Sequence, residues 1–342
     1  MVNSFSEKCL YFFNMLLSRM VNAGKRPETI NPATILIVKW DEIGDLVTAT
    51  HVFSMLRERF PNAVIELITK PQNMKLVQCD ENLDVVSPSL KHWNGRYDLH
   101  IELRGTWKSF FKTFRHLPGY RLDRGWVRFL QRGNQPHETI TNYRIVAPVL
   151  SDMPMHSPYI ATHEADAVKI KERLHEWGVS QYIVYHTGAR KALRRWPAAN
   201  FAALADHAFQ TFNLSSIFIG TPDELSQIEA VTVLMKTPAV ICTENINLAE
   251  LAVLIGGANA FVGNESGPLQ IADAMKVRSL SFFGPGVKDV FYPQHPNSLI
   301  IHKVLPCNPC DQVHCVHPEN PCISRITAEE AKHALGVVLR QF

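Results

Sequence analysis

The chain has 342 residues, of which 46% are hydrophobic and 20% are charged, and its formal net charge is +3. This length predicts about two domains, and the composition excludes collagen, coiled coil and wholesale disorder. A net charge this small excludes a nucleic-acid footprint over the whole chain, so any basic function needs local clustering. The seven cysteines, without a convincing secretory signal, favour a cytoplasmic protein with reduced thiols.

Residues 1–31 predict an N-terminal amphipathic helix or extension. Two interpretations stay open for it: an interfacial helix on a membrane surface, with cations such as Lys8 and Arg19 nearby, or a helix packed on the body of the protein, which is commoner. No apolar run reaches the roughly 18 to 20 residues that a bilayer span requires. The apolar positions at helical spacing are Phe5, Cys9, Phe12, Phe13, Leu16, Leu17 and Met20.

Two series of short apolar runs follow, separated by amphipathic or loop stretches. The first series comprises residues 35–40, 64–69, 84–87 and 98–103, with the clearest helix over 46–60; the second comprises 182–186, 216–220, 239–243, 260–263, 279–283 and 299–302. Buried strands followed by helices imply parallel sheets covered on both faces. We therefore predict an α/β protein with two doubly wound, Rossmann-like domains and an active site in the cleft between them.

The polar stretch 151–164 is the best linker between these domains. The predicted organisation is an extension over 1–31, an N-terminal domain over 32–160, a C-terminal domain over 161–326 and a final helix over 327–342. Thr327 is the expected N-cap of that helix, with Glu329 and Glu330 in its first turns.

The first candidate motif lies where the first strand meets the first long helix. Asp41, Glu42 and Asp45 flank a turn at Gly44, at the carboxyl end of a strand, where doubly wound proteins place reacting groups. Asp45 is either a catalytic base or only a helix cap, whose pKa the helix amides would lower unless it is buried or paired. No G-x-G-x-x-G sequence occurs here, so a nicotinamide or flavin site has little support.

Two later motifs combine small residues with charge or hydroxyl groups. After His186, a small-residue turn leads to four cations that suit a diphosphate, or that form only a solvated basic loop. The stretch 263–268 runs from a strand into a helix and can bind an anion or sugar hydroxyls, or be only a tight turn. The four cations are Arg190, Lys191, Arg194 and Arg195.

Together these segments resemble glycosyltransferase family 9, the ADP-heptose heptosyltransferases of the lipopolysaccharide inner core. The resemblance covers about residues 34–340. It rests on Ile43-Gly44-Asp45, Arg194-Arg195-Trp196-Pro197, Gly263-Asn264-Glu265-Ser266-Gly267-Pro268 and Phe283-Gly284-Pro285, in this order and at these separations.

The resemblance implies a GT-B architecture, in which two Rossmann-like domains face a central cleft, and inversion at the anomeric carbon without a required metal. It implies that Asp45 is the general base, that Arg194 stabilises the departing ADP, and that the acceptor is a lipopolysaccharide inner-core sugar. The implied donor-binding residues are Thr187, Gly188, Lys191, Arg195, Glu265, Ser266, Gly267, Pro268 and Gln270.

Two residues depart from the family pattern. The family usually has Asp where this chain has Glu265 and His where it has Gln270, and both positions face the donor in the family. The alternatives are therefore a family member with another sugar nucleotide or acceptor, and a non-catalytic sugar-nucleotide-binding relative. A nucleotide-sugar epimerase of the same architecture would also explain the phosphate loops.

The stretch 104–132 holds eight cations, seven aromatic residues and a single acid, Asp123. This mixture favours an anionic, lipid-linked acceptor at the inner leaflet, with a solvated helix or single-stranded nucleic acid as alternatives. The rest of the chain has no nucleic-acid module, so we expect no nucleic-acid partner, and we expect a cytoplasmic protein peripheral on the inner membrane. The predicted acceptor-binding residues are Asp41, Gly44, Arg104, Lys108, Arg121 and Arg124.

Four cysteines cluster within sixteen residues near the C-terminus: Cys307, Cys310, Cys315 and Cys322. Their type matches a structural zinc or iron site, although the second pair is more widely spaced than usual. The alternative is a group of reduced thiols that only pack. Neither interpretation gives the cluster a part in catalysis, because four-thiolate sites are closed.

Overall fold

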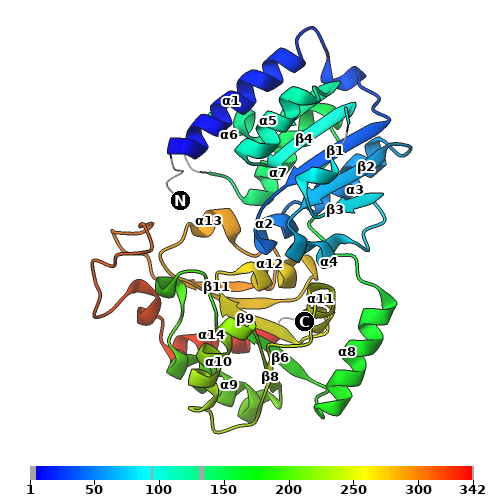
Figure 1. The fold of residues 1–342 in the computed structure, drawn as a ribbon. Coiled ribbons are helices and arrows are strands. Elements are labelled where there is room, and N and C mark those ends of the chain that lie inside the picture. Colours follow the sequence, from blue (N-terminus) through cyan, green and yellow to red (C-terminus); the bar gives the residue numbers. More distant parts are fainter. Residues whose placement is uncertain (1–4, 94, 131–134, 341–342) are drawn as a thin grey trace. The chain divides into compact units, whose positions relative to one another are not determined.

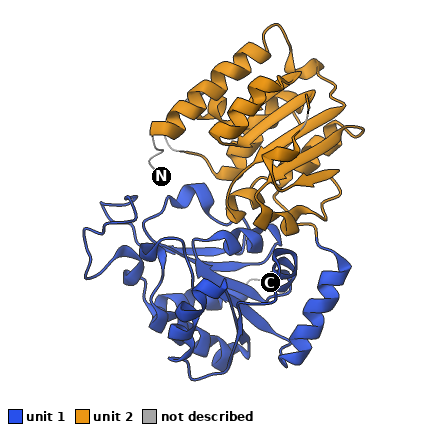
Figure 2. Ribbon diagram, viewed as in Figure 1, with its two compact units in different colours: residues 1, 162–342 blue, residues 2–161 orange. Residues whose placement is uncertain are grey.

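The computed structural model describes residues 5–93, 95–130 and 135–340. The chain forms two compact α/β units (Figure 2), unit 2 over Val2–Ala161 and unit 1 from Thr162 onward. Both sheets are entirely parallel, as the continuous apolar runs predicted. The division between the units lies within the polar stretch 151–164.

Unit 2 contains a five-stranded sheet in the order β3-β2-β1-β4-β5 (Figure 1). The chain adds β2 and β3 on one side of β1 and then β4 and β5 on the other, so the strand order reverses between β1 and β4. Open α/β sheets bind ligands beyond the carboxyl ends of their strands at such a reversal. The strands are β1 (Thr34–Lys39), β2 (Val64–Thr69), β3 (Val85–Ser87), β4 (Leu99–Arg104) and β5 (Tyr120–Asp123).

The long helix expected over 46–60 is in fact two helices. Between them, the hydroxyls of Thr48 and Thr50 donate to the carbonyls of Asp45 (2.9 Å) and Val47 (3.0 Å), local bonds that compete with a continuous helix. The helices of unit 2 are α1 (Phe5–Val21), α2 (Ile43–Val47), α3 (His51–Arg59), α4 (Met74–Val77), α5 (Trp107–Arg115), α6 (Arg124–Leu130) and α7 (Glu138–Val146).

Strand β5 has no counterpart among the expected strands, because two of its four residues, Arg121 and Asp123, are charged and do not form an apolar run. All four of its residues are buried, and the Arg121 side chain is fully enclosed. Arg121 donates to the side chains of Asn14 (2.6 Å) and Ser18 (2.7 Å) on α1, and it lies 3.5 Å from the carboxylates of Glu102 and Asp123. Helix α1 is therefore packed on the body of unit 2.

Replacing Arg121 by Met should lower the free energy of unfolding by about 3–5 kcal/mol, because Glu102 and Asp123 would be left buried without their cation. Urea denaturation measures this loss. Arg115→Met is the matched control, since Arg115 is exposed on the same unit and its loss should change stability by less than about 0.5 kcal/mol. Equal stability of both variants would contradict the structural role of Arg121.

Unit 1 contains a six-stranded sheet in the order β11-β10-β9-β6-β7-β8, so its strand order reverses between β6 and β9. The strands are β6 (Tyr182–His186), β7 (Ser215–Ile219), β8 (Ala239–Cys242), β9 (Ala260–Asn264), β10 (Ser279–Phe283) and β11 (Leu299–His302). The helices are α8 (Glu164–Glu176), α9 (Ala198–Phe212), α10 (Leu225–Thr232), α11 (Leu248–Gly256), α12 (Gly267–Ala274), α13 (Lys288–Phe291) and α14 (Ala328–Arg340).

Apolar side chains from β6, β7, β9, β10, α9 and α14 form the main core of unit 1. Thr327 caps α14: its hydroxyl accepts from the Glu330 amide (3.2 Å), and Glu330 accepts from the Thr327 amide (2.9 Å). Among the helices that the structure describes, none has the length and apolar character needed to cross a membrane.

Candidate active site

Asp45 lies in the first turn of α2, which follows the carboxyl end of β1 at the reversal point of the unit 2 sheet. Its side chain is partly exposed. Burial, and next the negative charge of Asp41, raise the pKa of Asp45 to about 7, and these effects exceed the lowering by Lys39 and Arg104. The lowering expected from the helix amides is thus outweighed, and the carboxyl group can take up a proton near neutral pH.

A buried charge network lies beneath Asp45. Lys39 is 3.3 Å from Asp41 and 3.7 Å from Glu138, and Arg104 is 3.7 Å from Asp41. Burial acts to raise the pKa of Glu138, but the charges of Arg124 and Lys39 outweigh it and hold this pKa at about 2. No sequence motif marks Glu138, which is distant from Lys39 and Asp41 along the chain and lies near them only because of the fold.

The predicted acceptor residues divide into buried and accessible groups. Arg124 is buried and binds Glu138 through both terminal nitrogens (2.5 and 2.8 Å), and Arg121 is enclosed against α1. Both guanidinium groups balance buried carboxylates, so the structure gives no support to an acceptor-binding role for either residue. Arg104 and Gly44 are partly exposed, Lys108 is exposed, and Asp41 is buried in its ion pairs.

The basic stretch 104–132 is therefore less available to a ligand than its composition suggested. Lys112 donates to the Leu90 carbonyl, and Arg128 lies 3.6 Å from Glu138. Arg132 lies outside the described residues. Because Lys112 and Arg128 already have partners within the protein, a groove for single-stranded nucleic acid, which needs free cations along its length, is less well supported.

A second polar site lies in unit 1, where the loops after β6 and β9 leave the sheet side by side. Asn264 joins three segments that are distant in sequence: its side chain donates to the Thr187 carbonyl (2.8 Å) and accepts from the Trp196 amide (3.0 Å). Asn264 was part of the quoted motif but was not predicted as a site residue. Its buried amide fixes the geometry of the site.

Four buried polar atoms at this edge have no hydrogen-bond partner among the described residues. They are Thr187 Oγ1, His186 Nδ1, Glu265 Oε2 and Ser266 Oγ. Each unpaired buried group costs about 1–3 kcal/mol, so their concentration at the reversal point is typical of a site that a polar ligand completes.

Arg194 adjoins this edge with a partly exposed side chain. Its Nη1 lies 3.1 Å from Glu265 Oε1, and its Nε donates to Gln312 Oε1 (2.6 Å). Burial raises the pKa of Glu265, and the charge of Arg194 opposes this. The Glu265 side chain also leaves no room for a side chain at position 286, because a Cβ on Gly286 would lie 2.0 Å from Glu265 Oε2.

The remaining predicted donor residues differ in their exposure and in their hydrogen-bond partners. Gln270 is buried, and its side-chain amide donates to the Phe291 carbonyl (2.8 Å), which ties α12 to α13. The expectation that Gln270 faces a donor stays a prediction. Lys191 is exposed, while Arg195 is partly exposed and donates to the Ala189 carbonyl (3.0 Å). The small residues expected at the site are buried Gly188 and, in the first turn of α12, Gly267 and Pro268.

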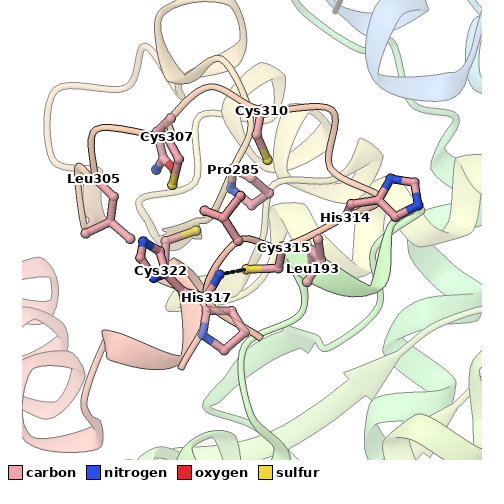
Figure 3. A pocket seen from close by; sticks show the side chains of 12 residues that line it. Leu193, Pro285, Leu305, Cys307, Cys310, His314, Cys315, His317 and Cys322 are labelled. Atoms are coloured by element: carbon pink, nitrogen blue, oxygen red, sulfur yellow. Dashed lines mark hydrogen bonds between the residues drawn. The ribbon is translucent and has the colours of Figure 1, made fainter. Parts of the chain in front are cut away.

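The four clustered cysteines line one small cavity of about 30 Å³. Figure 3 shows their sulfur atoms directed toward its interior, with Leu193 and Pro285 beside them. All four are free thiols. Among the described residues, no three His, Cys, Asp or Glu side chains are arranged to hold a metal ion.

Two doubly wound parallel α/β units form the GT-B architecture, the fold of the solved heptosyltransferase structure described below. The model of glycosyltransferase family 9 (heptosyltransferase) matches residues 90–320. The chain belongs to this family and is a glycosyltransferase.

Lipopolysaccharide heptosyltransferase 3 of Escherichia coli is 22% identical, over 75% of this chain and 85% of that protein. The structure of the E. coli ADP-heptose lipopolysaccharide heptosyltransferase II aligns with a TM-score of 0.72 at 18% identity, covering 90% of this chain and 99% of that chain. The iron-containing dodecameric glycosyltransferase TibC of enterotoxigenic E. coli H10407 aligns with a TM-score of 0.56 at 12% identity, covering 91% and 77%. These structural likenesses show the fold.

Proposed function

We propose that the protein transfers heptose, with inversion, from ADP-heptose to a sugar hydroxyl of the lipopolysaccharide inner core. The observation that carries this proposal is the Asp45 carboxyl, partly exposed at a sheet reversal point and titrating near neutral pH, in a chain of the heptosyltransferase family. The names of the relatives support the nature of the donor and the acceptor.

In this mechanism, Asp45 accepts the proton of the acceptor hydroxyl while that oxygen attacks the anomeric carbon of heptose. The bond from that carbon to the diphosphate breaks, and ADP leaves with increased negative charge. Arg194, Lys191 and Arg195 are the cations that stabilise it, and the orphaned hydroxyls of Thr187 and Ser266 bind donor oxygens. Unit 2 supplies the base and the acceptor site, and unit 1 supplies the donor site.

The test is ADP release from ADP-heptose in the presence of a panel of truncated lipopolysaccharides. Other sugar nucleotides belong in the panel, because Glu265 and Gln270 stand where the family usually has Asp and His. Release with one acceptor supports the proposal. Release only with another sugar nucleotide would favour the second candidate, a family member with a different donor, and donor binding without release would favour a non-catalytic relative.

We further propose that unit 2 works at the anionic membrane surface that carries the acceptor. Helices α1 and α5 pack together through rings: Phe13 lies 6.0 Å from Trp107, and Trp107 stacks on Phe111 at 6.1 Å. The exposed large apolar side chains of α1 and α5, together with Leu117 just beyond α5, are here called the α1–α5 face. It comprises Phe5, Phe12, Phe13, Leu16, Met20, Phe111, Phe114 and Leu117.

The charges around the α1–α5 face have one sign. The exposed charged residues of α1 and α5 are Lys8, Arg19, Lys108 and Arg115, whereas the acid Glu7 is paired with Arg104 at 3.2 Å. An apolar surface bordered by cations suits an anionic bilayer. We place the protein at the cytoplasmic face of the inner membrane on this basis.

The protein should therefore bind vesicles that contain phosphatidylglycerol and bind pure phosphatidylcholine vesicles at least about tenfold more weakly. Replacing Phe12 and Phe111 together by Ser should weaken binding by about tenfold or more, because both rings are exposed on the α1–α5 face. Val233→Ser, at a 79%-exposed apolar residue of unit 1, is the control and should bind as wild type. Vesicle co-sedimentation measures this, and equal binding by all three proteins would contradict it.

For the cysteine cluster we propose a structural zinc or iron ion held by Cys307, Cys310, Cys315 and Cys322. The ligand type fits, since four thiols line one cavity, and a fold relative is named as iron-containing. Among the described residues no three such side chains are arranged around one ion, so metal binding would have to draw the thiols together. Such an ion would hold the loops together and has no part in the transfer.

Purified protein should contain about one metal ion per chain by elemental analysis. Cys310→Ser should lose it, while Cys242→Ser, at a buried thiol outside the cluster, should retain it. Less than about a tenth of an equivalent in the wild type would leave the thiols as packing groups.

A further inference from the structure

Gln312 stands in the middle of the cysteine-rich segment in an unusual conformation. Its φ of 64° is in the left-handed region, which glutamine rarely adopts, and its side chain is buried. Such strain persists only where the surroundings enforce it, and it concentrates at functional sites. Gln312 is not among the residues to which the proposed mechanism assigns a role.

The Gln312 side chain contacts Arg194 directly. Its Oε1 accepts from Arg194 Nε at 2.6 Å, while Glu265 Oε1 lies 3.1 Å from Nη1 of the same guanidinium. A guanidinium has five N–H donors in one plane. Two contacts on different nitrogens fix that plane and leave N–H groups for a ligand.

The cysteine-rich segment also holds the chain next to Arg194. Leu193 lines the cavity of the four thiols, and the backbone N–H of Gln312 donates to Cys310 Sγ (3.3 Å). Gly284 packs so tightly here that a Cβ on it would lie 3.0 Å from the Leu193 carbonyl. The cysteine-rich segment therefore packs against the loop that carries Arg194 and supports its conformation.

We infer that Gln312 is a positioning residue, which orients the Arg194 guanidinium toward the diphosphate of the donor, and that the cysteine-rich segment serves to present it. This inference rests on the proposed role of Arg194. It gives the cysteine cluster a function in the donor site without placing a thiol in the chemistry.

The test is a double-mutant cycle between Gln312 and Arg194. Gln312→Ala should lower kcat by about 10- to 100-fold and weaken ADP binding several-fold, because a misdirected guanidinium loses most of its effect. In an Arg194→Ala background, the same change should cost nothing further. The readouts are ADP-heptose turnover and ADP affinity by calorimetry.

Three further variants separate positioning from folding. Gln312→Gly removes the backbone strain together with the acceptor, so its stability should not fall while its activity does. Gln312→Glu keeps an acceptor and should recover most of the activity. Val313→Ala, at an exposed neighbour, should behave as wild type.

The inference would be overturned if Gln312→Ala had wild-type activity. It would also be overturned if the double variant lost activity by the product of the two single losses, because the two residues would then act independently. Failure of the wild type to turn over ADP-heptose would instead refute the proposed function. The ADP-binding cycle would then still decide whether Gln312 acts through Arg194.

Discussion

Replacing Asp45 by Asn is expected to lower kcat by about 10²- to 10⁴-fold, the usual contribution of a positioned general base. The amide keeps the size of the side chain but cannot accept the hydroxyl proton. Glu42→Gln is the control, because Glu42 is three residues away, exposed and paired with Lys70 at 2.8 Å. Steady-state kinetics with a saturating acceptor measures both, and full activity of Asp45→Asn would refute the proposed base.

The pH dependence follows from the same carboxyl group. A base must be deprotonated, so kcat/KM of the wild type should rise with pH and level off above about 7, the pKa of Asp45. The residual activity of Asp45→Asn should lack this rise. A pH–rate profile flat from 5 to 8 in the wild type would contradict the assignment.

The free energy of unfolding of the wild type should fall as the pH rises, whereas its kcat/KM should increase. Because folding raises the pKa of Asp45 from 3.8, the folded state disfavours the charged form, and the wild type loses stability as the pH rises from about 4 to 7. Asp45→Asn escapes this loss, so it should be more stable than the wild type by on the order of 2 kcal/mol at pH 8 and by nothing below about pH 3. Lower activity with higher stability is the signature of a functional carboxylate.

Replacing Arg194 by Ala is expected to lower kcat by about 10²- to 10³-fold, because the departing ADP loses a charged donor that acts as the bond breaks. Arg194→Lys should recover only part of this, since an ammonium cannot bond Gln312, Glu265 and a phosphate in one plane. Arg190→Ala, in the exposed part of the same loop, is the control.

The rate loss in Arg194→Ala should exceed any loss of stability. Glu265 would lose its cation, and because the charge of Arg194 opposes the effect of burial, its pKa should rise further, which limits the cost of leaving this carboxyl group unpaired. Thermal unfolding checks this point. A variant that unfolds readily while keeping its turnover would assign Arg194 to the fold.

The sequence predicted most of the fold because buried parallel strands are continuous apolar runs. Four of the ten expected strands, 64–69, 182–186, 279–283 and 299–302, coincide with β2, β6, β10 and β11. Strand β5 was missed because its Arg121 and Asp123 mimic a surface segment, and burial of charge is a tertiary effect. The break between α2 and α3 was not predicted, because threonine occurs both inside helices and at their ends, so Thr48 and Thr50 are not a clear stop signal.

The site was predictable only where a motif fixes the backbone. The turn at Asp45 and the loops around Arg194 and Ser266 lie at reversal points, as their positions after strands implied. The burial of Arg121 and Arg124 was not predictable, because composition cannot distinguish a solvated cation from one neutralised by a buried carboxylate. Gln312 left no signal, because its conformation and its contact with Arg194 arise only in three dimensions.

The most direct test of heptosyl transfer by Asp45 is the mass of the acceptor. A lipopolysaccharide lacking heptose is incubated with ADP-heptose and either wild type or Asp45→Asn, and the product is measured by mass spectrometry. The account predicts an acceptor heavier by one heptose residue with the wild type and an unchanged acceptor with Asp45→Asn over the same time. An unchanged acceptor with the wild type, or equal conversion by both proteins, would contradict it.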